Sequence, residues 1–231
     1  MDRETGRRIL RSSGWLSGRP PEFQAAFLAG SRWQHLDAGA PVTTGGEDAG
    51  DIVGLARGVV AVTSVFGSPD TPIMHLAPAV FWMGYGPVLS GAPRRVTATA
   101  RTPVSIVRIA QGHVLGMLAG TPQWWRHFMP LALEYGDAAI GIAADLLIRG
   151  SERRCVAVLL RLSGCRFRDP EDAGVLEVPI GQEGLSAAAN LSRNTAGTIL
   201  RRLEEKGLIR CGYATIALSD IQALRAIADG A

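Results

Sequence analysis

Residues 180–210, IGQEGLSAAANLSRNTAGTILRRLEEKGLIR, hold two short helical patterns separated by a turn. In the first pattern Leu185, Ala188 and Ala189 have the i, i+3, i+4 spacing of a helix with one buried face. Alanine side chains on that face allow a second helix to approach closely. Residues 190–191 form the turn that follows. The first part of the stretch therefore predicts a short helix that packs against another.

The second pattern begins at Ser192, whose hydroxyl can accept a free backbone N–H of the next helix. This helix is expected over residues 193–206, and Gly207 is a natural stop. Its apolar positions fall on one side, at Ala196, Ile199, Leu200 and Leu203. Its polar positions fall on the other side, at Arg193, Asn194, Thr198, Arg201 and Arg202. The second helix is therefore expected to be amphipathic, with a basic outer face.

This order of helices is typical of a helix-turn-helix on duplex DNA, where the start of the second helix enters the major groove. There Arg193 can bind guanine O6 and N7, and Asn194 can bind adenine N6 and N7. The residues expected to contact DNA are Gln182, Ser192, Arg193, Asn194, Thr195, Thr198, Arg201 and Arg202. The alternative is an ordinary helical hairpin with a solvated basic face, since residues 193–210 carry only five basic against two acidic side chains.

A β hairpin is expected directly after the second helix. Residues 208–210 and 213–218 read as two strands, and Gly212 reads as the turn between them. Residues 220–229 then read as a short closing helix. Helix, turn, basic helix and hairpin in this order predict a winged helix-turn-helix.

The composition of the chain limits its class. It has 231 residues, 47% of them hydrophobic, and a formal net charge of +3. A pI near 9.0 permits nucleic-acid binding without demonstrating it. No apolar run approaches the roughly 20 residues of a membrane span. We therefore expect a cytoplasmic protein with no membrane partner.

The chain shows no pattern of a catalytic or metal site. Its three cysteines, Cys155, Cys165 and Cys211, have no CxxC spacing and are expected to be reduced thiols. The four histidines are scattered, and nucleophile-elbow, Walker-loop and paired-carboxylate motifs are absent from the sequence. The chain is therefore not expected to be an enzyme. Its cofactor is unknown, and a haem bound by a single histidine stays an alternative.

The N-terminal half has the pattern of a β domain. A small helix is expected over residues 21–29, and short apolar runs punctuated by glycine and proline follow from residue 31 to about 110. The clearest strand candidates are residues 51–55, 58–65, 72–76, 96–100 and 104–109. Many short strands with regular turn signals predict a sandwich or a jelly-roll barrel.

A loop rich in glycine and aromatic residues is expected over residues 81–95. One interpretation is an effector pocket in which backbone N–H groups and an arginine bind an anion. The candidate pocket residues are Trp82, Gly84, Tyr85, Gly86, Arg94 and Arg95. The other interpretation is a packed turn with exposed arginines, and the residues themselves do not decide between the two.

A long helix is expected from Pro122 to about residue 148, with Thr121 as its cap. Apolar residues recur along it at spacings of three and four, at Trp125, Phe128, Leu131, Tyr135, Ala138, Ile142 and Leu146. Such a stripe is typical of a coiled-coil dimer, with one flank on the β domain and the other against a partner. The alternative is a helix buried within one chain. Residues 149–151 read as a hinge.

The whole plan resembles the CRP/FNR transcription regulators. The resemblance rests mainly on residues 191–204, LSRNTAGTILRRLE, which are close to the recognition helix of that family. Residues 144–149 and 58–62 also look similar to it. The resemblance implies an α+β chain with an N-terminal β jelly-roll domain of the cyclic-nucleotide-binding type, a long dimerisation helix and a C-terminal winged helix-turn-helix. The expected boundaries are 1–120, 121–150 and 151–231.

The same resemblance implies a homodimer that reads a two-fold site in double-stranded DNA. If the protein is an activator, RNA polymerase is an expected partner. Asn194 stands where the cyclic-AMP branch often has glutamate, and Thr198 stands where it often has arginine. The standard half-site of the family is therefore not expected to apply.

The effector pocket departs further from the family. Gly84 takes the position of the ribose-binding glutamate, and Arg94 is followed by Arg95 in place of a small hydroxyl residue. An unpaired ribose hydroxyl costs about 1–3 kcal/mol, so weak or no cyclic-AMP binding is expected. The first cysteine is Cys155, so the N-terminal iron–sulfur cluster of the other branch is not expected either. Two further hypotheses remain: a ligand-independent regulator whose pocket is filled by its own residues, and an adaptor that does not bind DNA.

Overall fold

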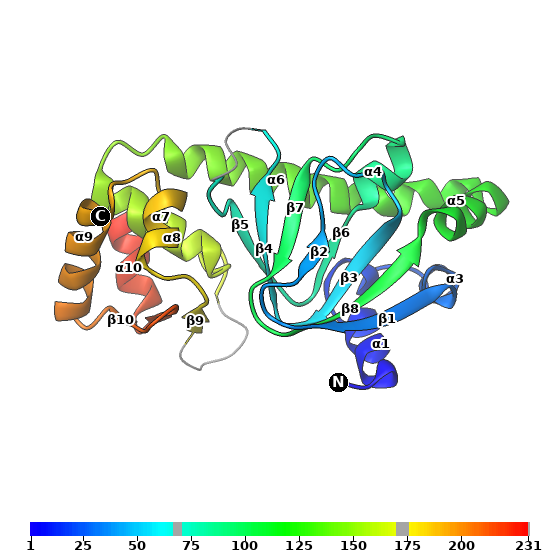
Figure 1. Cartoon of the computed structure of the whole chain (residues 1–231), viewed down its shortest axis with the longest axis horizontal. Coiled ribbons are helices and arrows are strands. Elements are labelled where there is room, and N and C mark those ends of the chain that lie inside the picture. Colours follow the sequence, from blue (N-terminus) through cyan, green and yellow to red (C-terminus); the bar gives the residue numbers. More distant parts are fainter. Residues whose placement is uncertain (67–70, 170–175, 231) are drawn as a thin grey trace. The chain divides into compact units, whose positions relative to one another are not determined.

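The computed structural model describes residues 1–66, 71–169 and 176–230. These residues group into two compact units. The first unit comprises Met1–Thr71 and Ala77–Gly136, and the second comprises Pro72–Leu76 and Asp137–Ala231. Figure 1 shows that the first unit contains two β-sheets together with several helices, whereas the second unit is mainly helical.

The first unit is built on two four-stranded antiparallel sheets. One sheet has the order β1-β8-β3-β6 and the other has the order β2-β7-β4-β5 (Figure 1). The strands are β1 (Ser31–Leu36), β2 (Pro41–Thr43), β3 (Asp51–Arg57), β4 (Val59–Ser64), β5 (His75–Pro78), β6 (Phe81–Met83), β7 (Val96–Ala100) and β8 (Val104–Ala110). Side chains from both sheets, such as Val60 of β4 and Ile106 of β8, pack together in one core. The expected two-sheet β domain is therefore confirmed.

Four of the five strands expected from the apolar runs lie where the sequence indicates, as β3, β4, β7 and β8. The strand expected at residues 72–76 is displaced, because β5 begins only at His75. Pro72 has no N–H to donate to a sheet, and the carbonyl of Met74 accepts a hydrogen bond from Arg161 instead of a strand partner.

Five α-helices of the first unit precede residue 121 and lie around the β1-β8-β3-β6 sheet: α1 (Arg3–Ser12), α2 (Gly14–Ser17), α3 (Pro21–Ala29), α4 (Tyr85–Ser90) and α5 (Gln111–Gly120). Trp15, Phe23 and Phe27 of α2 and α3 form a second core with Ile52 and Ile109 of the sheet. The helix at residues 21–29 is confirmed, whereas α1, α2 and α5 were not predicted. The loop expected at residues 81–95 is wrong in part, since it contains β6 and α4.

The long helix expected from Pro122 is divided in two. Pro122–Phe128 is a 3₁₀ helix, and α6 runs from Met129 to Leu146. Pro130 explains the division, because its ring would clash with the carbonyl of Arg126 in a continuous α-helix and it has no N–H for the bond. Thr121 precedes the 3₁₀ helix, but its side chain makes no cap hydrogen bond.

The apolar stripe expected along this helix is divided, since Trp125 and Leu146 are exposed to solvent whereas other members are buried. Phe128 and Leu131 are buried in the core of the first unit, and Tyr135 packs against the same core. A different row is exposed on α6 and directly after it, made of Met129, Leu133, Ile140 and Leu147. The helix therefore has one apolar flank on its own unit and a second flank that its own chain leaves open.

The second unit contains α7 (Ser151–Leu162), β9 (Leu176–Val178), α8 (Gln182–Ala188), α9 (Arg193–Glu205), β10 (Ile209–Cys211), β11 (Ile216–Leu218) and α10 (Ile221–Asp229). The strands form a small antiparallel sheet of order β10-β11-β9. Helix α7 is the scaffold, since it packs against α8, α9 and α10 and its apolar face is buried. Together with the β domain this confirms the α+β fold class. Among the described residues no helix is both long and apolar enough to cross a lipid bilayer.

We expect His75 to make the protein less stable as the pH falls. Burial, and then the positive charge of Arg161, lower the pKa of His75 from 6.5 to about 4. Between pH 6.5 and about pH 4 the imidazole of His75 is protonated in the unfolded chain but not in the folded chain. Acid therefore favours unfolding. The loss is about 2 kcal/mol between pH 8 and pH 5. Urea unfolding at both pH values measures it.

The control for this prediction is the exposed histidine His35. His75→Gln should reduce the loss of stability at pH 5, whereas His35→Gln should leave it as in the wild type. An undiminished loss in His75→Gln would mean that the imidazole of His75 is protonated normally in the folded protein.

Candidate nucleic-acid interface

The turn between α8 and α9 is built as the sequence predicts. Asn190 has a φ of +51°, a left-handed conformation that asparagine tolerates better than most residues. The N–H of Leu191 then donates to the carbonyl of Ser186 at 2.9 Å. This turn ends α8 within two residues of Ala188 and lets α9 begin at Arg193 in a new direction.

Ser192 caps α9 as expected. Its Oγ accepts a hydrogen bond from the N–H of Thr195 at 3.1 Å, and the two side-chain hydroxyls lie 2.8 Å apart. The cap occupies one of the free N–H groups at the helix start. Both residues are therefore fixed at the end of α9 that a helix-turn-helix presents to DNA.

Ser192→Ala is expected to lower the free energy of unfolding of the second unit by about 1 kcal/mol, because a free N–H loses its acceptor. Ser13 provides a matched control, since it is the N-cap of α2 but its side chain makes no cap hydrogen bond. Ser13→Ala should therefore change stability by much less. Chemical unfolding followed by circular dichroism compares the two, and equal effects would contradict the role assigned to the Ser192 cap.

The two faces of α9 divide as the sequence indicates. Ala196, Ile199, Leu200 and Leu203 are buried. Arg193, Asn194, Thr198, Arg201 and Arg202 are exposed. The polar face is therefore presented to solvent along the whole helix.

Gln182 of α8 connects the two helices. Its Nε2 donates to the carbonyl of Arg193 at 3.0 Å. A Cβ at Gly197 would lie 2.6 Å from the same Nε2, so the glycine gives Gln182 room to lie against α9. The mid-helix glycine is thus explained by close packing, and Gln182 is placed beside the first turn of α9.

The basic side chains of α9 have weak partners within the chain. Arg193 lies 3.6 Å from Glu183, and both side chains are exposed. Arg202 is paired with Glu152 at 2.7 Å, and Arg201 donates to Thr198 Oγ1 at 3.4 Å. Exposed ion pairs contribute only about 0–1 kcal/mol each. These arginines can therefore exchange their present partners for phosphate or base edges at little cost.

The hairpin of the wing is shorter than predicted. Its second strand begins at Ile216, because the N–H of Gly212 donates to the carbonyl of Thr215 at 2.8 Å and closes a tight turn. Tyr213 in that turn is fully exposed. Sequence reasoning also missed Glu204, whose Oε1 accepts from the N–H of Cys211 at 2.8 Å and ties the end of α9 to the wing.

The candidate effector pocket is arranged differently from the expectation. Arg94 is buried, and its Nη2 lies 2.7 Å from Asp51 Oδ1. Arg108 Nη1 binds the other oxygen of the same carboxylate at 2.9 Å. The three residues line a cavity of about 360 Å³, together with Arg32 and Glu47. The arginine expected to bind an anion therefore already holds a carboxylate of its own chain.

The other candidate pocket residues lie around this pair or away from it. Trp82 is buried in the second core, and Tyr85 packs edge-on against Tyr135. Gly84 has a φ of +85°, and a Cβ there would lie 2.8 Å from Arg94 Nη1. Arg95 is exposed. Arg94 is the one candidate among Trp82, Gly84, Tyr85, Gly86, Arg94 and Arg95 that lines the cavity.

Asp51 and Arg108 were not among the residues predicted for this site. Asp51 opens β3 and Arg108 lies near the end of β8, where the sheet register pairs Arg108 with Val53. No local motif links these positions to Arg94, so only the paired strands bring them together. In the described parts of the chain no three His, Cys, Asp or Glu side chains are grouped as a metal site would require.

The capped two-helix turn, the exposed basic face of α9 and the β10–β11 hairpin define a winged helix-turn-helix, a class of DNA-binding domain. Residues 153–227 match the model of the Crp-like helix-turn-helix domain family. No curated protein is similar enough in sequence to match the chain. The chain therefore carries a Crp-like DNA-binding domain.

Solved structures show the same fold over nearly the whole chain. A candidate cyclic nucleotide binding protein from Ruegeria pomeroyi superposes with a TM-score of 0.67 and 19% identity, over 99% of both chains. FixK2 from Bradyrhizobium japonicum has a TM-score of 0.70 and 16% identity, over 85% of this chain and 96% of that one. A CRP/FNR-family transcriptional regulator from Thermus thermophilus has a TM-score of 0.63 and 22% identity, over 86% and 98%. The matched domain and the shared fold agree with the resemblance to the CRP/FNR transcription regulators.

Proposed function

We propose that this protein is a DNA-binding transcription regulator of the CRP/FNR type, which acts as a homodimer and reads a two-fold site in double-stranded DNA. The observation that carries the proposal is the exposed polar face of α9, which presents Arg193 and Asn194 at the capped start of the helix. In the usual docking this end enters the major groove, where arginine and asparagine each bind one purine through two hydrogen bonds. The other residues on or beside this face are assigned to phosphates or flanking bases: Ser192, Thr195, Thr198, Arg201 and Arg202. Gln182 lies next to the first turn of α9 and is assigned to the same surface.

The dimer is proposed to form along α6. Four apolar side chains along this helix are more than half exposed: Met129 (61%), Leu133 (62%), Ile140 (69%) and Leu147 (80%). Their spacings of four, seven and seven place them on one heptad stripe, with small residues at Gly136 and Ala143 between them. An open stripe of this length on a helix fits a second copy of the same helix. Two-fold symmetry then presents two α9 helices to half-sites one helical turn apart.

We propose an effector other than cyclic AMP, or none. A Cβ at position 84 would lie 2.7 Å from the backbone carbonyl oxygen of Asp51, at a φ of +85° that side chains rarely adopt, and the guanidinium of Arg94 is paired with Asp51. The pocket thus lacks the family's ribose-binding glutamate, and the family's phosphate-binding arginine is already paired with a carboxylate. If the regulator activates transcription, RNA polymerase is its further partner. We also propose that the chain divides at residues 120 and 150 into an effector-type domain, a dimerisation helix and a DNA-binding domain.

The Asp51–Arg94 pair favours one specific second candidate, a regulator that binds DNA without any ligand. In this candidate the carboxylate of Asp51 takes the place of the effector anion, and Arg108 holds its other oxygen. The β domain would then be a structural part of an active dimer. Such a protein differs from the first candidate in one measurable respect, which is the DNA affinity of the ligand-free state.

Fluorescence anisotropy of the purified, ligand-free protein on DNA from its own upstream region tests both candidates. The titration is made with and without competitor DNA at two salt concentrations, because phosphate contacts alone give strongly salt-dependent binding that is blind to sequence. Tight binding that survives competitor supports the ligand-independent regulator. Weak, competitor-sensitive binding supports an effector-dependent one and directs a ligand screen to the β domain. Failure to bind DNA with any added effector, and failure to enrich a site from random DNA, would contradict the regulator itself.

A further inference from the structure

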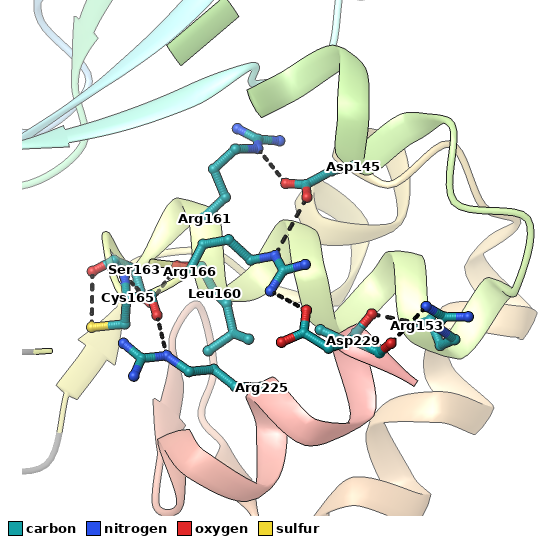
Figure 2. A network of polar contacts seen from close by, with 10 residues as sticks. Asp145, Arg153, Leu160, Arg161, Ser163, Cys165, Arg166, Arg225 and Asp229 are labelled. Carbon is teal, nitrogen blue, oxygen red and sulfur yellow. Dashed lines mark hydrogen bonds and ion pairs between the residues drawn. The ribbon is translucent and has the colours of Figure 1, made fainter. Parts of the chain in front are cut away.

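A buried carboxylate lies at the C-terminal end of α6. The side chain of Asp145 is 4% exposed and is paired with two arginines. Its Oδ2 lies 2.9 Å from Arg161 Nε, and its Oδ1 lies 3.6 Å from Arg166 Nε. Figure 2 shows Asp145 pointing away from its own helix toward these two side chains. The last turn of α6 is therefore held by charge as well as by packing.

The two arginines extend the contact to other segments of the second unit. Arg166 Nη1 binds Asp229 Oδ1 at 2.8 Å, which reaches the C-terminal end of α10 (Figure 2). Arg161, on α7, donates from Nη1 to the carbonyl of Met74 at 2.6 Å. One carboxylate thus joins the end of α6 to α7, to α10 through Arg166, and to the Pro72–Leu76 segment through Arg161. We call these residues the Asp145 cluster: Asp145, Arg161, Arg166 and Asp229.

A cluster of this kind resists rotation of its members. Buried charges are tolerated only in geometries that keep them paired and hydrogen-bonded. A turn of α6 relative to α7 would separate Asp145 from Arg161. The buried carboxylate would then keep only its longer contact with Arg166, and Arg161 would keep only the carbonyl of Met74. Packing contacts between apolar side chains are less directional and allow small rotations. The cluster therefore fixes the angle at which α6 meets α7.

The cluster is separate from the surface assigned to DNA. Its members lie on α6, on α7, just after α7 and on α10, whereas the exposed face of α9 carries Arg193 and Asn194. Helix α7 nevertheless packs against α8 and α9 and carries them. Any change in the angle between α6 and α7 is therefore passed on to the recognition helix.

We propose that Asp145 is a positioning residue for DNA binding. It sets the orientation of α7, and with it α9, relative to the end of α6. The inference rests on the homodimer proposed above, in which α6 pairs with its copy. In that dimer the angle at each Asp145 determines how far apart, and in what rotational register, the two recognition helices are held. The protein would then owe its half-site spacing preference to this carboxylate.

The test measures spacing preference with Asp145→Asn in the full-length protein. A two-fold site is first enriched from random duplex DNA with the wild type. Duplexes are then made in which the half-sites are moved apart or together by one and two base pairs, and one duplex carries a single half-site. One base pair changes the register by about 35°. Anisotropy titrations give the affinity of each protein for each duplex, and Asp137→Asn on the exposed side of the same helix is the matched control.

We expect the wild type and Asp137→Asn to lose at least about tenfold in affinity for a shift of one base pair, since both helices cannot then dock together. Asp145→Asn should lose less than about threefold for the same shift, and its affinity for the single half-site should stay within about twofold of the wild type. Arg166→Gln removes the contacts with Asp145 and Asp229 but keeps the Asp145–Arg161 pair, so it should relax the preference in the same direction and to a smaller extent. It keeps the proposal testable if Asp145→Asn does not fold.

Two outcomes overturn the inference while leaving the proposed function intact. One is a wild-type spacing preference in both cluster variants. The other is an equal loss of affinity on every duplex, including the single half-site, which is the result of general destabilisation. If the wild type enriches no two-fold site at all, the proposed homodimer fails and the inference fails with it.

Discussion

Arg193→Ala is expected to lower the affinity for the enriched two-fold site by about 2–6 kcal/mol, because each of two half-sites loses a bidentate base contact of about 1–3 kcal/mol. Arg193 stands in the first turn of α9 with an exposed side chain, and its weak pair with Glu183 gives little to offset the loss. Affinity for random DNA should fall far less, since each subunit of the dimer loses at most one phosphate contact there. The ratio of specific to random binding, measured by competition at fixed salt, is the quantity to compare.

Arg3→Ala is the matched control, since Arg3 is exposed on α1 in the other unit. It should leave both affinities unchanged. If Arg193→Ala lowers binding to all DNA by the same factor, Arg193 contacts phosphate and does not read a base. If it changes neither affinity, the exposed face of α9 is not the DNA surface, and the adaptor hypothesis gains support.

Leu133→Glu is expected to convert the dimer into a monomer. Leu133 lies in the open stripe of α6, so the substitution removes two apolar side chains from the proposed interface and places two like charges against each other. Burial of a leucine side chain is worth about 2 kcal/mol, so the dimer should lose at least about 4 kcal/mol, or roughly a thousandfold in its dissociation constant. Sedimentation equilibrium or light scattering over a range of concentrations measures the change.

Leu115→Glu makes the same chemical change at a partly exposed leucine of α5, outside the stripe. It should leave the mass of the particle unchanged. A dimer that persists in Leu133→Glu and is lost in Leu115→Glu would move the interface to α5. A wild-type protein that is monomeric at every concentration would remove the basis for the dimer.

The DNA-binding unit could be predicted closely because its signals are local. The cap at Ser192, the left-handed turn at Asn190 and the periodicity of α9 are each encoded within a few residues of where they act. The same holds for α10, whose cap Asp220 accepts from the N–H of Ala223. Local hydrogen bonds of this kind compete little with tertiary packing, so sequence reasoning finds them.

Other elements were hidden or misread for identifiable reasons. In α5 three glycines, Gly112, Gly116 and Gly120, lower the helix propensity and obscure the pattern. Helix α1 has few apolar residues, although its cap at Asp2 was a readable signal. Pro130 was also readable, and its effect on a continuous helix follows from its ring alone.

The apolar stripe of α6 and the pocket could not be settled from the sequence. Apolar residues occur around most of that helix, so the sequence does not tell which flank the rest of the chain covers. The Asp51–Arg94 pair joins residues 43 positions apart, and the Asp145 cluster joins α6 to α10. Such contacts depend on the register of strands and on helix packing, for which a single sequence carries no direct signal.

The carboxylate that Arg94 already holds has a consequence for ligand selection. The carboxylate of Asp51 competes with any incoming anion for Arg94. Because it is part of the same chain, its effective concentration is high and does not depend on the concentration of the ligand. An anion that enters the cavity has to displace Asp51 from Arg94. Its apparent affinity is therefore reduced in proportion to the fraction of molecules in which Asp51 and Arg94 stay paired. A dilute, singly charged anion would therefore bind only weakly. The regulator would respond only to a molecule that makes additional contacts with the cavity wall, and the threshold of that response is set by a residue that touches no DNA.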